Sequence, residues 1–181
     1  MQKAVFLDRD GVLNFDSGFV SDLDNVKILP KVIEGLNKMK TLGFMTIIIS
    51  NQSGVARKYF DLETMWAVDA RIKQLINKDK NLLDYSFYCP HHPEFDKKCN
   101  CRKPKIGLIK KAVTKYNLDM NQSFFIGDKV EDIICGKNVD CKTILVPKNL
   151  HKFTIINDQN KQPDFIAKDL LEASYWIEKN I

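Results

Sequence analysis

Two aspartates separated by one arginine follow an apolar run near the start of the chain, in the sequence AVFLDRDGVLN. The carboxylate of Asp8 can attack phosphorus, and a second carboxyl at Asp10 can protonate the leaving oxygen and later take a proton from water. Two ionised carboxylates this close repel each other unless a positive charge or a shared proton lies between them. A bare Asp-x-Asp pair more often forms a turn or a helix cap, so it needs support from other motifs.

Two further polar motifs also follow short apolar runs. In SNQSG, the hydroxyl of Ser50 and the side-chain amides of Asn51 and Gln52 can bind a transferring phosphoryl group, although this sequence alone is typical of an ordinary turn. In CRKPK, Arg102 and Lys103 supply fixed positive charge, with a solvated basic loop as the alternative. Each motif is weak by itself.

The fourth motif, FFIGDKVED, places Asp128 after a glycine at the end of an apolar run. Mg²⁺ prefers carboxylate oxygens from separate strands, with water and substrate phosphate as its other ligands. Asp132 either supports this site or caps a helix. The ordered set of Asp-x-Asp, hydroxyl, lysine and Gly-Asp is far more specific than any of its members.

The segment CPHHPEFDKKCNCRKP carries the residue types of a zinc site. Its candidate ligands are Cys89, His91 or His92, Cys99 and Cys101. Three cysteines and one histidine complete a closed tetrahedral zinc site, so we expect this metal to brace the loop rather than to act on substrate. The alternative, cysteines buried as small apolar residues, fits Cys135 and Cys141 better than this polar loop.

The elements that must position these motifs alternate along the chain. Short apolar runs predict buried strands over residues 4–7, 44–49, 85–88, 123–126 and 143–146. Helical periodicity predicts helices over residues 30–42, 62–77, 106–116 and 170–177. This alternation predicts an α/β fold, a Rossmann-like three-layer sandwich with a mainly parallel sheet, and its ligand site lies beyond the carboxyl ends of the strands.

Length and composition bound the interpretation. The 181 residues predict a single domain over 1–181, and the 39 residues from 11 to 49 leave no room for a cap domain between the first two motifs. No apolar run approaches the roughly 20 residues of a membrane helix and no leader is visible, so we expect a cytoplasmic protein without membrane contact. We also expect a monomer. The net charge of +5 is scattered and has no aromatic stacking platform, which favours a small anionic substrate over nucleic acid.

With its motifs in this order, the chain resembles the haloacid dehalogenase superfamily of aspartate-dependent phosphatases over almost its whole length. The resemblance implies that Asp8 is the nucleophile and Asp10 the general acid and base. It also implies that Ser50 and Lys103 stabilise the phosphoryl group. The implied Mg²⁺ ligands are the carboxylates of Asp8 and Asp128 and the backbone carbonyl of Asp10.

The cysteine loop narrows the resemblance to small zinc-containing phosphatases that act on D-glycero-D-manno-heptose 1,7-bisphosphate or on histidinol phosphate. Their shared CPH…CxCRKP pattern implies His91 as the histidine ligand, while NQSGVAR and CPHHP look like the heptose group. The heptose group implies Mg²⁺-dependent removal of the 7-phosphate, in the sugar metabolism that supplies lipopolysaccharide heptose. The substrate contacts it implies are Asp16, Ser17, Gly18, Phe19, Asn51, Gln52, Ser53, Arg57, Arg102 and Lys129.

Some positions depart from the heptose pattern. Phe19 stands where tyrosine is frequent, and Lys58 stands where a glycine commonly follows the arginine, which puts the loop conformation there in doubt. His151 is expected to be a solvated loop residue. A histidinol-phosphate phosphatase and, in a different class, a non-catalytic zinc-braced binding protein stay open as alternatives.

Overall fold

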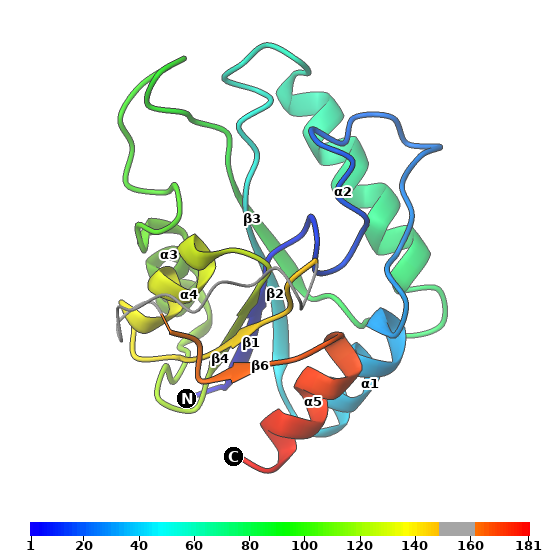
Figure 1. The fold of residues 1–181 in the computed structure, drawn as a ribbon, viewed down its shortest axis with the longest axis vertical. Coiled ribbons are helices and arrows are strands. Elements are labelled where there is room, and N and C mark those ends of the chain that lie inside the picture. The colour runs from blue at the N-terminus through cyan, green and yellow to red at the C-terminus, as the bar shows by residue number, and fades with distance from the viewer. Residues whose placement is uncertain (149–161) are drawn as a thin grey trace.

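The computed structural model describes residues 1–148 and 162–181 and has a six-stranded sheet at its centre (Figure 1). The strand order is β3-β2-β1-β4-β5-β6, and every neighbouring pair is parallel. The strands are β1 (Ala4–Leu7), β2 (Met45–Asn51), β3 (Tyr85–Cys89), β4 (Phe124–Gly127), β5 (Lys142–Leu145) and β6 (Phe165–Ile166). The predicted parallel α/β fold is confirmed.

Helices cover both faces of this sheet. They are α1 (Val32–Thr41), α2 (Leu62–Ile76), α3 (Gly107–Tyr116), α4 (Val130–Lys137) and α5 (Leu170–Glu178). The core on one face joins α1, α2 and α5, and a second core joins α3 and α4 to the other face (Figure 1). Only one helix separates β1 from β2, and only one separates β2 from β3, so the described chain carries no cap domain.

The central strand β1 shows why the sheet forms here. Val5 and Leu7 pack into the first core, and Ala4 and Phe6 into the second. All four side chains are fully buried, since successive residues of a strand face opposite layers. A strand covered on both faces therefore appears in the sequence as an unbroken apolar run.

The predicted elements are all present, with ends that differ by no more than two residues. The helix α4 was given no predicted range. The strand β6 was not predicted, because two residues carry no periodicity and their place depends on backbone pairing with β5. Cys135 and Cys141 are buried, as expected, whereas His151 lies outside the described residues. Within residues 1–148 and 162–181, no helix is both long and apolar enough to span a bilayer.

Candidate active site

The polar motifs meet at the carboxyl ends of β1, β2 and β4, where they line a pocket of about 470 Å³. Predicted site residues that line it are Asp8, Asp10, Asp16, Gly18, Phe19, Ser50, Asn51, Gln52, Ser53, Arg102, Lys103 and Lys129. Among the described residues, Ser17 and Arg57 were predicted substrate contacts but do not line this pocket. The sheet thus gathers motifs that are more than 100 positions apart in the sequence.

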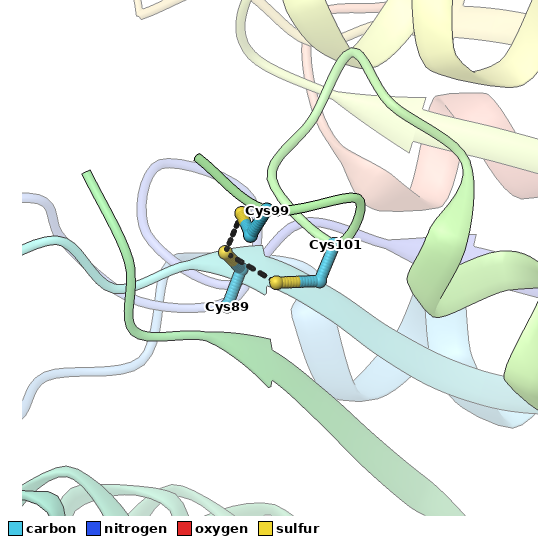
Figure 2. Close-up of side chains that lie close together, drawn as sticks. All are labelled: Cys89, Cys99 and Cys101. Atoms are coloured by element: carbon cyan, nitrogen blue, oxygen red, sulfur yellow. Dashed lines mark hydrogen bonds between the residues drawn. The ribbon is translucent and has the colours of Figure 1, made fainter. Parts of the chain in front are cut away.

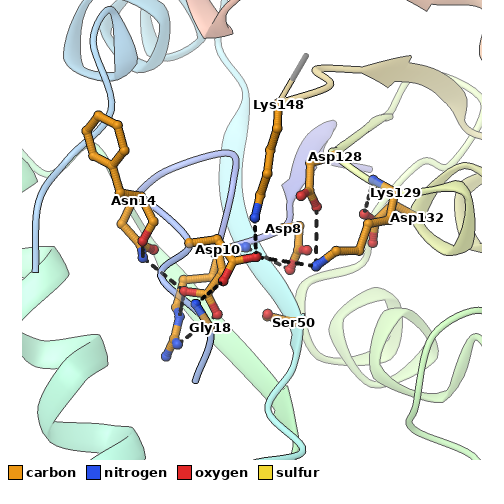
Figure 3. A network of polar contacts seen from close by, with 12 residues as sticks. Asp8, Asp10, Asn14, Gly18, Ser50, Asp128, Lys129, Asp132 and Lys148 are labelled. Carbon is orange, nitrogen blue, oxygen red and sulfur yellow. Dashed lines mark hydrogen bonds and ion pairs between the residues drawn. The ribbon is translucent and has the colours of Figure 1, made fainter. Parts of the chain in front are cut away.

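Asp8 is a buried carboxylate at the end of β1 (Figure 3). Its Oδ1 lies 2.9 Å from Lys103 Nζ and accepts the backbone N–H of Arg9 at 2.8 Å. Burial opposes ionisation, but the charge of Lys103 and a hydrogen bond from Ser50 hold the pKa of Asp8 below its ordinary value. Asp8 is therefore ionised near neutral pH, as a nucleophile must be.

Lys103 reaches the site from the segment that follows the cysteine loop. Its Nζ contacts Asp8, lies 2.6 Å from Asp132 Oδ1 and donates to the carbonyl of Ile49 at 2.7 Å. These three acceptors match the three N–H groups of an ammonium. Burial alone would lower the pKa of Lys103. The negative charges of Asp132 and Asp8 raise it by more than burial lowers it, so the side chain stays charged.

Asn51 secures the backbone of Lys103. Its Oδ1 accepts the Lys103 N–H at 2.9 Å, and its Nδ2 donates to the Lys103 carbonyl at 3.1 Å. The predicted role of Asn51 was a substrate contact. In the structure its amide holds the catalytic lysine candidate beside β2.

The two aspartates of the first motif have separate cationic partners. Lys103 pairs with Asp8, whereas Arg9, which is fully buried, pairs with Asp10 at 2.9 Å. The repulsion between the carboxylates is therefore relieved by two cations rather than by a shared proton. Sequence reasoning assigned no role to Arg9, although an arginine between two aspartates was visible in the motif.

Asp8, Asp128 and Asp132 each place a carboxylate oxygen within 4.8 Å of the others. Asp128 Oδ1 is buried without a hydrogen-bond partner in the described chain, and the nearest cation, Lys129 Nζ, is 3.8 Å away. Burial and the charge of Asp8 raise the pKa of Asp128 to about 7. An orphaned oxygen among crowded carboxylates fits a divalent cation such as Mg²⁺.

Asp132 both caps a helix and supports the site, the two alternatives that the sequence left open. Its carboxylate accepts the Lys129 N–H at the start of α4 at 3.2 Å, and it also pairs with Lys103. Gly127 permits this packing, because a Cβ there would lie 2.1 Å from Asp132 Cβ. Gly11 likewise has φ +88°, and a Cβ there would lie 2.4 Å from Asp128 Oδ2.

The cysteine loop brings three sulfurs together (Figure 2). The Sγ of Cys89 lies 2.9 Å from that of Cys101 and 3.6 Å from that of Cys99. Burial opposes ionisation of Cys99, but hydrogen bonds from Cys101 and from backbone N–H groups lower its pKa, whereas burial raises the pKa of Cys89 and of Cys101. The described cluster does not include the predicted ligand His91, whose Nδ1 lies 3.2 Å from Asp96 Oδ2.

Arg57 lies between aromatic rings beside the pocket. Its guanidinium carbon is 4.2 Å from the ring centroid of Phe95 and 5.7 Å from that of Phe19, and Nη2 is 3.2 Å from His92 Nε2. Lys58, which follows it, adopts the left-handed φ of 60° despite its Cβ. The absence of glycine at this position therefore leaves the turn intact.

A lysine that the sequence analysis missed contacts the substrate-loop candidate Asp16. Lys148 Nζ lies 2.6 Å from Asp16 Oδ2, and Lys129 Nζ lies 3.8 Å from the same oxygen. The carboxylate of Asp16 thus ties its loop to two lysines from the far side of the pocket. The contact joins positions 132 residues apart, so no local pattern could reveal it.

An ionised aspartate, a buried lysine and a cluster of carboxylates at the ends of parallel strands are the arrangement expected of a phosphatase of the haloacid dehalogenase class. Residues 100–173 match the family model described as HAD-hydrolase-like. The D-glycero-beta-D-manno-heptose-1,7-bisphosphate 7-phosphatase of Pasteurella multocida is 36% identical to this chain and covers 98% of each sequence. The enzyme of that name from Escherichia coli K12 is 38% identical and covers 78% of each.

A solved structure extends this likeness. The D,D-heptose 1,7-bisphosphate phosphatase from B. bronchiseptica, complexed with magnesium and phosphate, has a TM-score of 0.85 and 27% identity, over 99% of this chain and 100% of that one. This chain belongs to the HAD-like hydrolase family, in the group that contains these phosphatases. The predicted resemblance to that family is confirmed.

Proposed function

We propose that this chain is a phosphoric monoester hydrolase that removes the 7-phosphate of D-glycero-β-D-manno-heptose 1,7-bisphosphate. The relative from Pasteurella multocida, which is named for this reaction, matches 98% of this chain. The observation that carries the chemistry is Asp8, a buried carboxylate kept ionised by Lys103 at the floor of an open pocket. The monomeric state and the cytoplasmic location stay predictions.

The reaction proceeds in two steps on side chains at the strand ends. Asp8 attacks phosphorus, and the bond to the sugar oxygen breaks as Asp10 protonates that oxygen. Water then attacks the aspartyl phosphate, Asp10 takes its proton, and Asp8 is regenerated with release of phosphate. Ser50 donates a hydrogen bond to a phosphoryl oxygen. The fixed positive charge of Lys103, whose three N–H groups are already paired, stabilises the negative charge that accumulates on these oxygens.

Mg²⁺ is the metal found with phosphate in the B. bronchiseptica neighbour. In this chain the carboxylates of Asp8 and Asp128 and the backbone carbonyl of Asp10 would hold the ion, which supplies positive charge against the phosphoryl oxygens. The unpartnered oxygen of Asp128 supports that assignment. Asp132 keeps Lys103 in place from the other side.

The loop of Cys89, Cys99 and Cys101 is proposed to bind zinc with His91 as the fourth ligand. The three clustered sulfurs support three of the four positions. The fourth requires the His91 ring to exchange its contact with Asp96 for the metal. Because Arg102 follows Cys101 directly, zinc would set the approach of that arginine to the pocket.

A second phosphate on the substrate gives a use to cations beyond those the first phosphate needs. Arg102 and Lys129 both line the pocket, while Lys103 is already occupied by its carboxylates. A remote phosphate bound there contributes binding energy that orients the reacting one. Histidinol phosphate, the alternative substrate, brings an ammonium and an imidazole toward these cations and is expected to be repelled.

The test compares kcat/KM for the heptose bisphosphate and for histidinol phosphate with the same enzyme, with and without Mg²⁺. We expect the bisphosphate to be preferred and hydrolysis to require Mg²⁺. Equal or better turnover of histidinol phosphate would move the assignment to that substrate. Absence of any phosphatase activity, aryl phosphates included, would favour a zinc-braced binding protein instead.

A further inference from the structure

Arg9 is the largest side chain that is fully buried in the described structure, yet the reaction above gives it no task. Its Nε and Nη2 donate to the two oxygens of Asp10, at 3.0 and 2.9 Å. Nη2 also donates to Gln52 Oε1 at 2.8 Å, and Gln52 Nε2 donates to Asp10 Oδ2 at 2.8 Å. Arg9, Asp10 and Gln52 therefore form a closed ring of hydrogen bonds.

A fourth donor completes the shell around Asp10. Asn14 Nδ2 donates to Asp10 Oδ1 at 2.9 Å, so each carboxylate oxygen accepts two hydrogen bonds. A carboxylate offers about four acceptor positions, and all of them are filled here. The orientation of Asp10 is thus fixed by its neighbours, and a water molecule must displace one donor to reach it.

We propose that Arg9 is a positioning residue that holds Asp10 for the hydrolysis of the aspartyl phosphate. This inference rests on the proposed function, because Asp10 needs an orientation only if it transfers protons. Water forms a bond to phosphorus, the bond from phosphorus to the Asp8 oxygen breaks, and that oxygen keeps the electron pair. The proton of the water passes to Asp10, which exchanges one neutral amide donor for the water while the two-pronged bond from Arg9 is kept.

The surroundings of Arg9 separate it from the substrate. It does not line the pocket among the described residues, and its guanidinium carbon lies 5.7 Å from the ring centroid of Tyr88. The hydroxyl of Tyr88 donates to Asp69 at 2.6 Å, which secures the ring beneath the guanidinium. Arg9 therefore reaches the pocket only through the side chains it bonds, Asp10 and Gln52. If its role were merely structural, Arg9 variants would lose stability without a selective loss of aspartyl phosphate hydrolysis.

The test uses rapid kinetics with 4-nitrophenyl phosphate and Mg²⁺. Its leaving group needs little protonation, so formation of the aspartyl phosphate depends weakly on Asp10, whereas its hydrolysis depends on Asp10 strongly. We expect Arg9→Met to release a burst of about one nitrophenolate per active site, followed by a steady rate at least tenfold below wild type. Arg9→Lys, which keeps the charge but not the two-pronged geometry, should show a smaller defect of the same kind.

Tyr88→Phe is the matched control, since it removes a buried hydrogen bond beneath Arg9 without touching Asp10. It should melt earlier but show the wild-type time course. A folded Arg9→Met enzyme that slows both phases equally, or turns over like wild type, would overturn the proposal. If Arg9→Met does not fold, Arg9→Lys decides by the same criterion, whereas a wild-type enzyme without Mg²⁺-dependent turnover would instead refute the proposed function.

Discussion

The strand ends and the surrounding loops of this pocket are built in different ways. Asp8, at the end of β1, and the side chain of Lys103 that reaches it are buried and bonded to each other and to backbone groups. On the loops, Phe19 is 46% exposed and Arg57 is supported by aromatic rings and one histidine. We infer from this difference that the strand ends support the proposed phosphoryl chemistry, whereas the loops select which ester is accepted.

This division can be broken by substitution. A change at the strand ends should impair every phosphate ester alike, because all share the same transferring group. A change in the loops should impair large substrates more than small ones. Zinc removal loosens a loop from outside the pocket, so the loss of activity it causes should be intermediate between these two cases.

The largest effect is expected at the nucleophile. Asp8→Asn keeps the shape of the side chain but removes the attacking charge, so kcat should fall by about a thousandfold or more for any phosphate ester. Asp79→Asn, in an exposed turn, is the control and should keep full activity. Retention of more than about a tenth of wild-type kcat by a folded Asp8→Asn protein would remove Asp8 from its role.

The next effect concerns the cysteine loop. Purified protein should contain about one zinc per chain by elemental analysis, and Cys101→Ser should lose it and bind substrate more weakly because the loop loosens. Cys141→Ala removes a buried thiol outside the loop and should retain the metal. Zinc-free wild-type protein purified without a chelator would contradict the assignment.

A moderate effect is expected at Arg102. Arg102→Ala should reduce kcat/KM for the bisphosphate by about 1.5 to 3 kcal/mol, the range of a hydrogen bond to a charged group, and should change aryl monophosphate hydrolysis little. Arg71→Ala removes a half-buried arginine of α2, outside the pocket, and should leave kcat/KM unchanged for both substrates. Equal losses on both substrates would mean that Arg102 belongs with the strand-end chemistry.

The smallest expected effect is a change in stability at Asp164, which lies outside both the strand ends and the loops of the pocket. Its Oδ2 accepts the N–H and the hydroxyl of Thr143 at 2.7 Å each. Burial raises the pKa of Asp164, but these bonds hold it below the ordinary 3.8, so the charged form stabilises the fold above that pH and the contribution is lost as pH falls through the folded pKa.

Asp164→Asn should therefore be less stable than wild type at pH 7, by less than about 1 kcal/mol because water screens this half-exposed group. The difference in free energy of unfolding, measured by urea denaturation, should narrow below about pH 4. A constant difference from pH 3 to 7 would mean that the carboxylate charge contributes nothing here.

The strand-end half of the site was predictable from sequence because each residue directly follows a buried run. Parallel strands then bring Asp8, Ser50 and Asp128 to one edge of the sheet without further information. The roles of these residues remain proposals, although their meeting place is observed. For Asp132 the sequence left two options open, support of the site or a helix cap, and it did not indicate the ion pair with Lys103.

The loop half was predictable only in part, because its contacts depend on tertiary packing. Asp16 pairs with Lys148, and Gln52 bonds to Arg9 and Asp10, although both were predicted to contact substrate. Arg57 stacks on rings beside the pocket instead of lining it. Such pairings join residues with no shared periodicity, so composition and spacing do not reveal them.

The most direct measurement follows D-glycero-β-D-manno-heptose 1,7-bisphosphate by ³¹P nuclear magnetic resonance during incubation with enzyme and Mg²⁺. The account predicts that the signal of the 7-phosphate disappears as inorganic phosphate grows, while the signal of the 1-phosphate persists. The same sample with Asp8→Asn should stay unchanged over that time. Release of the 1-phosphate first, or no release under conditions where aryl phosphates are hydrolysed, would contradict it.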